Sequence, residues 1–246
     1  MKKNLLIVGL IMTLSLSASA QYKGFAFGFK VGPNLGWTGS TTAAAVNEGS
    51  RVGLDLGVVA EYYFSSNYAI VTGVNVGFLG GHYSFVNATS LDSLGNPATF
   101  NVDRIYKSTI YEIPLMLKMV TNELGNAPIR AYAEVGGGIG LAAKKVKVKD
   151  AIDGGNMADS WITTNKEFSN LRASLKIGAG VQYSLDETTR LCAGLYFSHD
   201  FINSINYLSP NYYKYYNGDK EIGARPDNQR LNVLQNRIGL EIGVLF

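Results

Sequence analysis

A two-residue alternation of apolar and other positions runs through this chain, and such alternation is typical of β-strands. In the stretch RVGLDLGVVAEYYF, residues 51–64, every even-numbered position is apolar. The odd-numbered positions hold mainly glycine and the charged residues Arg51, Asp55 and Glu61. Because successive side chains of a strand point to opposite faces, one face of this strand would be apolar and the other rich in charge and glycine.

The same pattern recurs and predicts eight strands, at residues 24–34, 51–64, 68–79, 109–120, 129–141, 170–183, 189–198 and 236–246. Thirteen charged residues fall within these strands, all on the side opposite the apolar positions: Lys30, Arg51, Asp55, Glu61, Glu112, Lys118, Arg130, Glu134, Arg172, Lys176, Arg190, Arg237 and Glu241. Glycine shares that side. It is a poor choice for a solvated strand face, but it saves space beside long side chains. We therefore interpret the charged face as a crowded interior and the apolar face as one that contacts lipid.

In hydrocarbon, only helices and closed barrels satisfy all of their backbone hydrogen bonds. Strands of about 9–11 residues cross the membrane, and eight is the smallest common number in bacterial outer-membrane barrels. Short connections at 65–67, 122–127 and 184–188 alternate with long ones at 35–50, 80–108, 142–169 and 199–235. The pattern predicts an all-β fold, an eight-stranded antiparallel transmembrane up-and-down β-barrel in the bacterial outer membrane, with long loops outside.

The first twenty residues have the form of a secretory signal peptide. Lys2 and Lys3 precede an apolar run at 4–16, and Ala18-Ser19-Ala20 forms a small-residue cleavage site. We expect residues 1–20 to be cleaved and 21–246 to form the barrel domain. Without the two leader lysines the chain has 20 basic and 19 acidic residues, so its charge indicates no nucleic-acid partner.

Four segments of the chain resemble a known family. They are GFAFGFKVGPNLGW after the signal peptide, IYEIPLMLKM, AYAEVGGGIG and the closing RIGLEIGVLF. These segments resemble the PorT-like outer-membrane β-barrel proteins of the Bacteroidota, over essentially the whole mature chain. The resemblance implies an eight-stranded barrel in the outer membrane. It carries over no catalytic or binding residue.

The thirteen inward charges suggest either a plug or a pore. Eight strands enclose an interior that side chains just fill, and an unpaired buried charge is costly, so pairing across strands is favoured. We expect a lumen plugged by salt bridges, and a monomeric barrel with a structural or surface-interaction role through four long loops. A narrow passive channel for small solutes is the first alternative.

A rim enzyme that modifies lipid or peptide is the second alternative, because Ser198, His199 and Asp200 adjoin the seventh strand. A nucleophile needs its base within hydrogen-bond reach, whereas neighbouring strand residues point to opposite faces. We therefore expect no enzyme. His82 has no metal-ligand spacing to His199, and GGGIG at 136–140 lies within a strand with no helix after it, so neither a metal nor a cofactor is expected. Pro114 should break the register of the fourth strand.

Two loop segments are candidates for contacts. Lys144, Lys145, Lys147 and Lys149 alternate with valine, and they would either form the solvated face of a hairpin or contact the phosphates of outer-membrane lipopolysaccharide. The segment 206–230 holds five tyrosines, which suit recognition or packing of the loop on itself. The partners expected are outer-membrane lipid and an unidentified surface or periplasmic protein.

Overall fold

A computed structural model describes residues 24–40, 45–91, 97–143, 146–152, 155–164, 168–204, 214–217, 220–224 and 233–246. The expected signal peptide, Lys144, Lys145 and most of the tyrosine-rich segment lie outside the described residues. Within the described ranges, no helix has the length and apolar character needed to cross a membrane.

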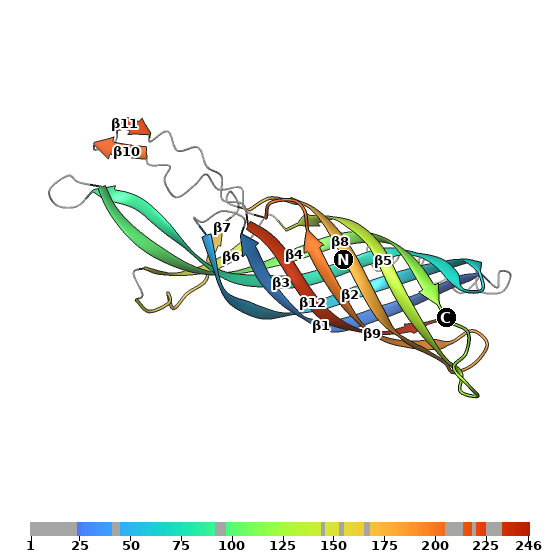
Figure 1. Cartoon of the computed structure of the whole chain (residues 1–246). Helices are drawn as coiled ribbons and strands as arrows, with labels where there is room; N and C mark the ends of the chain where they lie inside the picture. The colour runs from blue at the N-terminus through green and yellow to red at the C-terminus, as the bar shows by residue number, and fades with distance from the viewer. Residues whose placement is uncertain are drawn as a thin grey trace, which may run out of the picture.

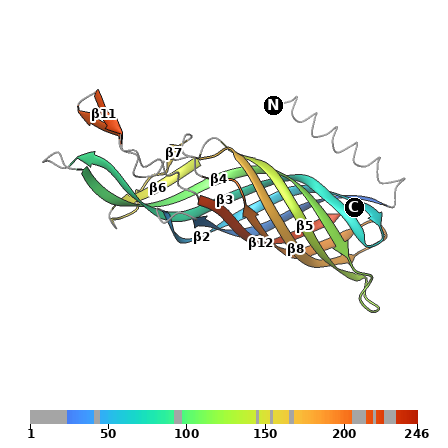
Figure 2. The same ribbon diagram turned by 45° about the horizontal axis from the view of Figure 1, so that its top comes forward.

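Eight strands form a closed ring in the order β3-β2-β1-β12-β9-β8-β5-β4, and pairing between β3 and β4 closes it (Figure 1). Each of these pairings is antiparallel. The strands are β1 (Phe25–Ser40), β2 (Ala45–Ser65), β3 (Tyr68–Leu91), β4 (Pro97–Val120), β5 (Ile129–Ala142), β8 (Leu171–Ser184), β9 (Arg190–Asp200) and β12 (Val233–Leu245). The turned view shows the same tilted cylinder (Figure 2). The predicted eight-stranded antiparallel barrel is confirmed.

The strands continue well past the barrel at one end, where β3 and β4 form a long hairpin (Figures 1 and 2). There β6 (Val146–Ile152) pairs with β4, and β7 (Ile162–Thr164) pairs with β6. The expectation of long loops at 35–50 and 80–108 is therefore wrong, because most of these residues are paired strand. A separate sheet contains β10 (Lys214–Asn217) and β11 (Lys220–Ala224).

An apolar cluster explains why this extension is ordered. Its members alternate with polar residues and face one another across the strands: Ala45, Tyr83, Phe85, Val102, Tyr106, Val146, Val148, Phe168 and Val233. Each is at most 8% exposed. Tyr106 also donates its hydroxyl to Gln235 on β12. Burial of this many side chains stabilises paired strands beyond the barrel wall, so the mouth of the barrel has a hydrophobic core of its own.

The opposite end has the short connections that the sequence predicts. β2 ends at Ser65 and β3 begins at Tyr68. In the turn between β8 and β9, the Asp186 carboxylate accepts the backbone N–H groups of Thr189 at 2.7 Å and Thr188 at 2.8 Å. These bonds favour the ionised form and lower the pKa of Asp186 to about 2. Asp186 therefore acts as a turn-closing acceptor.

Pro114 does not break the register of β4. The strand pairs continuously with β5 from Ile110 to Val120, and Pro114 itself lies opposite Gly138. Its ladder with β3 has no register shift near this position. The Pro114 carbonyl accepts the Thr72 hydroxyl at 2.8 Å, although the Pro114 nitrogen itself has no hydrogen to donate to the ladder.

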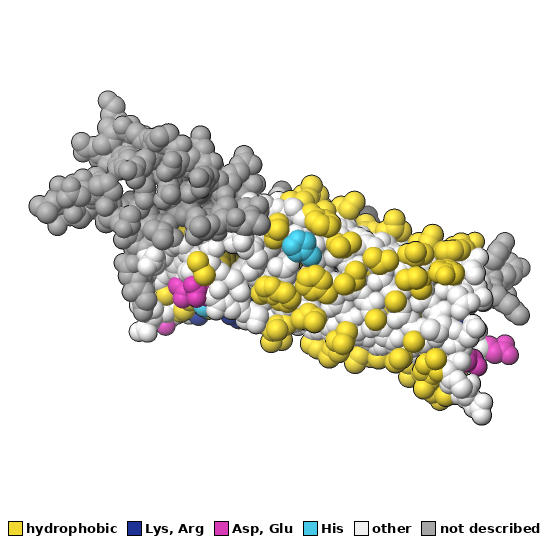
Figure 3. Space-filling model, in the orientation of Figure 1, with side chains coloured by type: hydrophobic (Ala, Val, Ile, Leu, Met, Phe, Trp, Pro, Cys, Tyr) yellow, Lys and Arg dark blue, Asp and Glu magenta, His cyan; other side chains and the backbone are white. Residues whose placement is uncertain are grey.

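The outer wall of the barrel is apolar, as predicted. Leu115 is 65% exposed and Ile139 is 69% exposed, values that water would penalise but lipid would not. On the face shown in Figure 3, hydrophobic side chains cover the barrel wall and charged ones gather toward its ends. Exposed aromatic residues mark the short-turn end: Tyr62, Phe64, Tyr68, Tyr183 and Phe246. Such a girdle is typical of the membrane interface.

Candidate functional site

The lumen holds equal numbers of opposite charges. Among the described residues, six basic side chains point inward, Lys30, Lys118, Arg172, Lys176, Arg190 and Arg237. Six acidic side chains share the space, Asp55, Glu61, Glu112, Glu134, Asp200 and Glu241. The alternation of each strand places them there, because the neighbouring positions face outward. Charge balance is what a narrow interior of low dielectric requires.

Nearest the extended mouth, Arg237 bridges two acids. Its guanidinium lies 2.8 Å from Glu112 and 3.5 Å from Asp55. Asp55 also accepts the Asn34 amide at 2.9 Å and the Tyr196 hydroxyl. Beside this group, Arg172 forms a salt bridge with Asp200. One cation therefore bridges two carboxylates, from β2 and β4.

At mid-height the arrangement is reversed, and one acid bridges two cations. Glu241 on β12 pairs with Lys30 on β1 and, at 3.2 Å, with Lys176 on β8. The Lys176 ammonium also lies 4.1 Å from the centre of the Tyr196 ring. A cation–π contact of this kind stabilises a partly desolvated ammonium.

Toward the short turns, Lys118 lies between Glu61 at 2.5 Å and Glu134 at 3.6 Å. Its ammonium is also 4.4 Å from the centre of the Tyr132 ring. Glu61 accepts the Tyr63 hydroxyl at 2.7 Å. The three layers together link charged residues of β1, β2, β4, β5, β8, β9 and β12 across the lumen.

The glycines leave the space that these long side chains occupy. A Cβ atom on Gly138 would lie 2.7 Å from the Glu112 carboxyl carbon, and one on Gly239 would lie 2.6 Å from the Tyr196 ring. Real Cβ atoms do not approach so closely. The GGGIG segment is therefore part of a strand wall packed against the interior, and the interpretation of the glycine face as crowded is confirmed.

Little empty volume remains between the charges. A cavity of about 10 Å³ lies among Lys30, Asp55, Lys176 and Glu241. Another of about 40 Å³ lies among Lys118, Glu134 and Cys192. Since one water needs at least about 10–15 Å³, these two cavities have room for isolated waters and not for a continuous column.

Two residues expected in the lumen lie elsewhere. Arg130 is the second residue of β5, and its guanidinium donates to the backbone carbonyls of Thr121 and Ser66, each at 2.7 Å. Its hydrogen-bond partners are therefore backbone carbonyls at the short-turn end, and not the acids of the lumen. Arg51 lies where the β2–β3 register slips, between Gly49 and Leu54. The slip leaves Arg51 in a groove of the outer wall.

Asp200 is a lumen residue that the sequence analysis did not include. It pairs with Arg172 and is 5% exposed. The signal was present, because Asp200 continues the inward alternation of Tyr196 and Ser198 by one more step. The strand predicted from the sequence ends at residue 198, which leaves Asp200 in a rim cluster with Ser198 and His199.

The Ser198, His199 and Asp200 segment does not form a catalytic triad. Ser198 is 1% exposed and faces the lumen. His199 points the other way, and its Nδ1 atom lies 2.5 Å from the Asn236 side-chain oxygen. His82 pairs with Asp103 at 2.7 Å. The described residues contain no cluster of three metal-ligating side chains.

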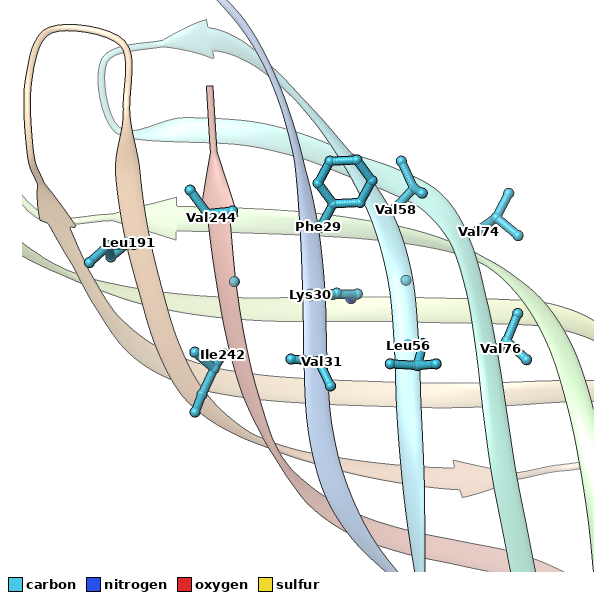
Figure 4. Close-up of a pocket in the computed structure, with 12 residues that line it drawn as sticks. Phe29, Lys30, Val31, Leu56, Val58, Val74, Val76, Leu191, Ile242 and Val244 are labelled. Atoms are coloured by element: carbon cyan, nitrogen blue, oxygen red, sulfur yellow. The ribbon is translucent and has the colours of Figure 1, made fainter. Parts of the chain in front are cut away.

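A shallow hollow of about 620 Å³ lies on the outer wall. Its lining comes from β9, β12, β1, β2 and β3, and Figure 4 shows Phe29 and Val31 on β1, Leu56 on β2 and Ile242 on β12. The lining is almost entirely apolar, so the hollow belongs to the lipid-contacting band and suits an acyl chain.

A second groove, of about 510 Å³, lies on the outer wall nearer the extended end, where the apolar band ends. Arg51, Lys107 and Lys147 line its upper part, and Leu54 and Phe78 line its lower part. Of the four lysines expected at the rim, Lys147 and Lys149 are on β6, while Lys144 and Lys145 lie outside the described residues. Lys107 and Arg51 were not expected at this rim.

Three solved structures of bacterial proteins are similar to this chain. Neisserial surface protein A shares 14% identity across 91% of this chain and 96% of its own, with a TM-score of 0.38. OprG of Pseudomonas aeruginosa shares 11% across 92% and 97%, with a TM-score of 0.41. Ail, the attachment invasion locus protein of Yersinia pestis, in complex with the heparin analogue sucrose octasulfate, shares 15% across 91% and 99%, with a TM-score of 0.35. All three are weak similarities of fold.

No curated protein matches the chain. A family model does, and its description is outer membrane protein beta-barrel domain. The match runs over residues 17–220 and therefore includes seven of the eight strands of the ring. The chain belongs to this family of outer-membrane β-barrel proteins, which places it in the bacterial outer membrane.

Proposed function

We propose that this protein is a monomeric, non-conducting barrel that anchors its strand extension and loops at the cell surface. The observation that carries the proposal is the lumen, in which five cations pair with six anions in layers around cavities of about 10 and 40 Å³, while the sixth cation, Arg190, donates to the Tyr63 hydroxyl. Eight strands leave no more room than these side chains fill. A structural or interaction role is then what remains for the barrel.

Ion passage would require these layers to separate. Each bridging residue, such as Arg237 or Glu241, contacts charges from two strands. Moving one of them aside leaves its partners unpaired in a medium of low dielectric, which costs several kcal/mol. The hydrophobic cluster at the extended mouth would also block the path of an ion, since its side chains are buried against one another. The alternative of a narrow passive channel is therefore disfavoured.

The part available for partners is the extended end. Short turns of outer-membrane barrels face the periplasm and long connections face outward, so the β3–β4 hairpin and β6 would lie outside the cell. Lipopolysaccharide surrounds this end, and a surface protein is its second possible partner. Export by a cleaved signal peptide and membership of the PorT-like group are further parts of this proposal.

An enzymatic role at the rim has no support from the geometry. A serine nucleophile needs a base within about 3 Å, whereas Ser198 faces the lumen and His199 contacts Asn236. We propose that the protein is not an enzyme.

Thiol accessibility tests the closed lumen. Cys192 is the one cysteine of the chain, so a Cys192→Ser background allows a single thiol to be placed by Ser198→Cys, at a lumen position that is 1% exposed. We expect a small charged thiol reagent to label this position at least roughly 100-fold more slowly than Ser66→Cys in the exposed short turn, because labelling must await local opening.

Both variants should label fully after unfolding, and a heat-dependent gel shift should show that both are folded beforehand. Comparable labelling rates in the folded state would mean that water and solutes reach the lumen, which contradicts the proposal.

A further inference from the structure

We propose that the groove formed by β2, β3, β4 and β6 binds a phosphorylated glycolipid of the outer leaflet, with its phosphate on Arg51, Lys107 and Lys147. The groove is on the outside of the barrel wall. The proposal therefore holds whether or not the lumen conducts ions. It extends the expected lysine rim to a site whose three cations come from β2, β4 and β6.

The groove has two chemically different halves. Its upper lining contains three cationic side chains, Arg51, Lys107 and Lys147. Its lower lining contains Leu54 and Phe78, which are 39% and 44% exposed and belong to the apolar band. Among the residues that the structure describes, no acidic side chain lines it. A molecule with an anionic head and hydrocarbon chains matches both halves, whereas a free anion would use only the upper one.

The register of the strands places like charges together. Lys107 on β4 and Lys147 on β6 are direct Cα partners in the antiparallel ladder. Like charges directly opposite one another destabilise a strand pair. Within the described ranges neither lysine forms an ion pair with a carboxylate, nor does Arg51. This arrangement has a cost in the unliganded protein that a bound phosphate would remove.

An aromatic ring gathers the cations on one side. The Trp161 ring centre lies 4.4 Å from the Lys107 ammonium, 5.4 Å from that of Lys149 and 6.0 Å from the Arg51 guanidinium. A tryptophan face attracts cations through its quadrupole but does not neutralise their charge. Trp161 therefore holds these side chains close together while leaving them able to bind an anion.

Two acids of the same region, Asp150 and Asp103, are engaged elsewhere. Asp150 receives two hydrogen bonds from the Arg104 guanidinium, each at 2.7 Å. Asp103 contacts His82 at 2.7 Å. Lys149 donates to the backbone carbonyl of Asp159 at 2.8 Å, so we assign it a supporting role beside the three groove cations.

The experiment uses tryptophan fluorescence and lipids that differ only in phosphate. Trp37 and Trp161 are the two tryptophans of the chain, so Trp37→Phe leaves Trp161 as the sole reporter. The full-length protein in neutral detergent is titrated with diphosphorylated lipid A, with dephosphorylated lipid A and with inorganic phosphate. We expect a saturable change with diphosphorylated lipid A, at least tenfold weaker binding of the dephosphorylated lipid, and weakening by salt.

The variant Lys107→Gln with Lys147→Gln should bind diphosphorylated lipid A at least tenfold more weakly. Its thermal stability in the absence of lipid should equal or exceed that of the parent, since one like-charge pair is gone. The matched control, Lys214→Gln with Lys220→Gln on β10 and β11, removes the same charge and should bind like the parent.

Three outcomes would overturn the proposal. Equal affinity for the two forms of lipid A would show that phosphate is not recognised. Unchanged affinity in the Lys107 and Lys147 variant would place the site elsewhere. An identical response to inorganic phosphate at the same concentration would make the ligand a free anion and not a lipid.

Discussion

Replacement of Arg237 by methionine is expected to destabilise the folded barrel by about 3–5 kcal/mol, the range for breaking a buried ion pair from one side. Arg237 is the bridge between Glu112 and Asp55, at 2.8 Å and 3.5 Å. Glu112 is 5% exposed, so its unpaired carboxylate has no access to bulk water. Methionine keeps most of the volume, and the loss is therefore mainly electrostatic.

The measurement is the free energy of unfolding in urea, with the protein folded into neutral lipid vesicles. Arg130→Met is the matched control, because Arg130 donates to exposed backbone carbonyls at the turn end and contacts no lumen acid. Its effect should stay within about 1 kcal/mol. If the two variants lose similar stability, the charges of the lumen do not form the buried network described above.

The second large effect concerns the outer wall. Leu56→Arg puts a charge in the apolar band, where Leu56 is 41% exposed beside Val31 and Val58. We expect a loss of roughly 2–4 kcal/mol in the same unfolding assay, as for arginine near the midplane of such barrels. Hydrocarbon cannot solvate the guanidinium, which must reach toward the interface or draw water inward.

Glu123→Arg in the turn between β4 and β5 provides the comparison. Glu123 is exposed and lies outside the apolar band, so arginine there should change stability by less than about 0.5 kcal/mol. Equal tolerance of arginine at both positions would mean that Leu56 faces water, and that the assignment of the outer face to lipid is wrong.

The barrel wall could be predicted because the two-residue alternation of apolar and other positions determines its strands and their two faces. Alternation over eight segments gives strand number, facing and the identity of the crowded side, and Leu56, Glu112 and Gly138 all lie where it places them. The strand ends were harder. The predicted strands were limited to the length that crosses a membrane, so residues 35–50 and 80–108 were interpreted as loops. In the structure, strand pairing continues past the membrane there, and the cluster around Tyr83 and Tyr106 stabilises it.

Single residues escaped prediction where local geometry overrides alternation. The register slip next to Arg51 and the nearby turn carbonyls around Arg130 are tertiary features that no two-residue pattern contains. Asp200 was missed because its strand was predicted two residues too short. The groove of Arg51, Lys107 and Lys147 needs β2, β3, β4 and β6 to lie side by side in that order, and the sequence alone does not reveal that β6 pairs with β4.

Single-channel recording on the purified wild-type protein in a planar bilayer tests the central claim most directly. The three charge layers, led by Arg237, Glu241 and Lys118, together with the apolar cluster at the mouth, predict a silent baseline under applied voltage. A heat-dependent gel shift of the same preparation should show that the barrel is folded. The absence of current then indicates a closed barrel and not an absent one. Steady, well-defined ion conductance through the unmodified protein would contradict the closed lumen.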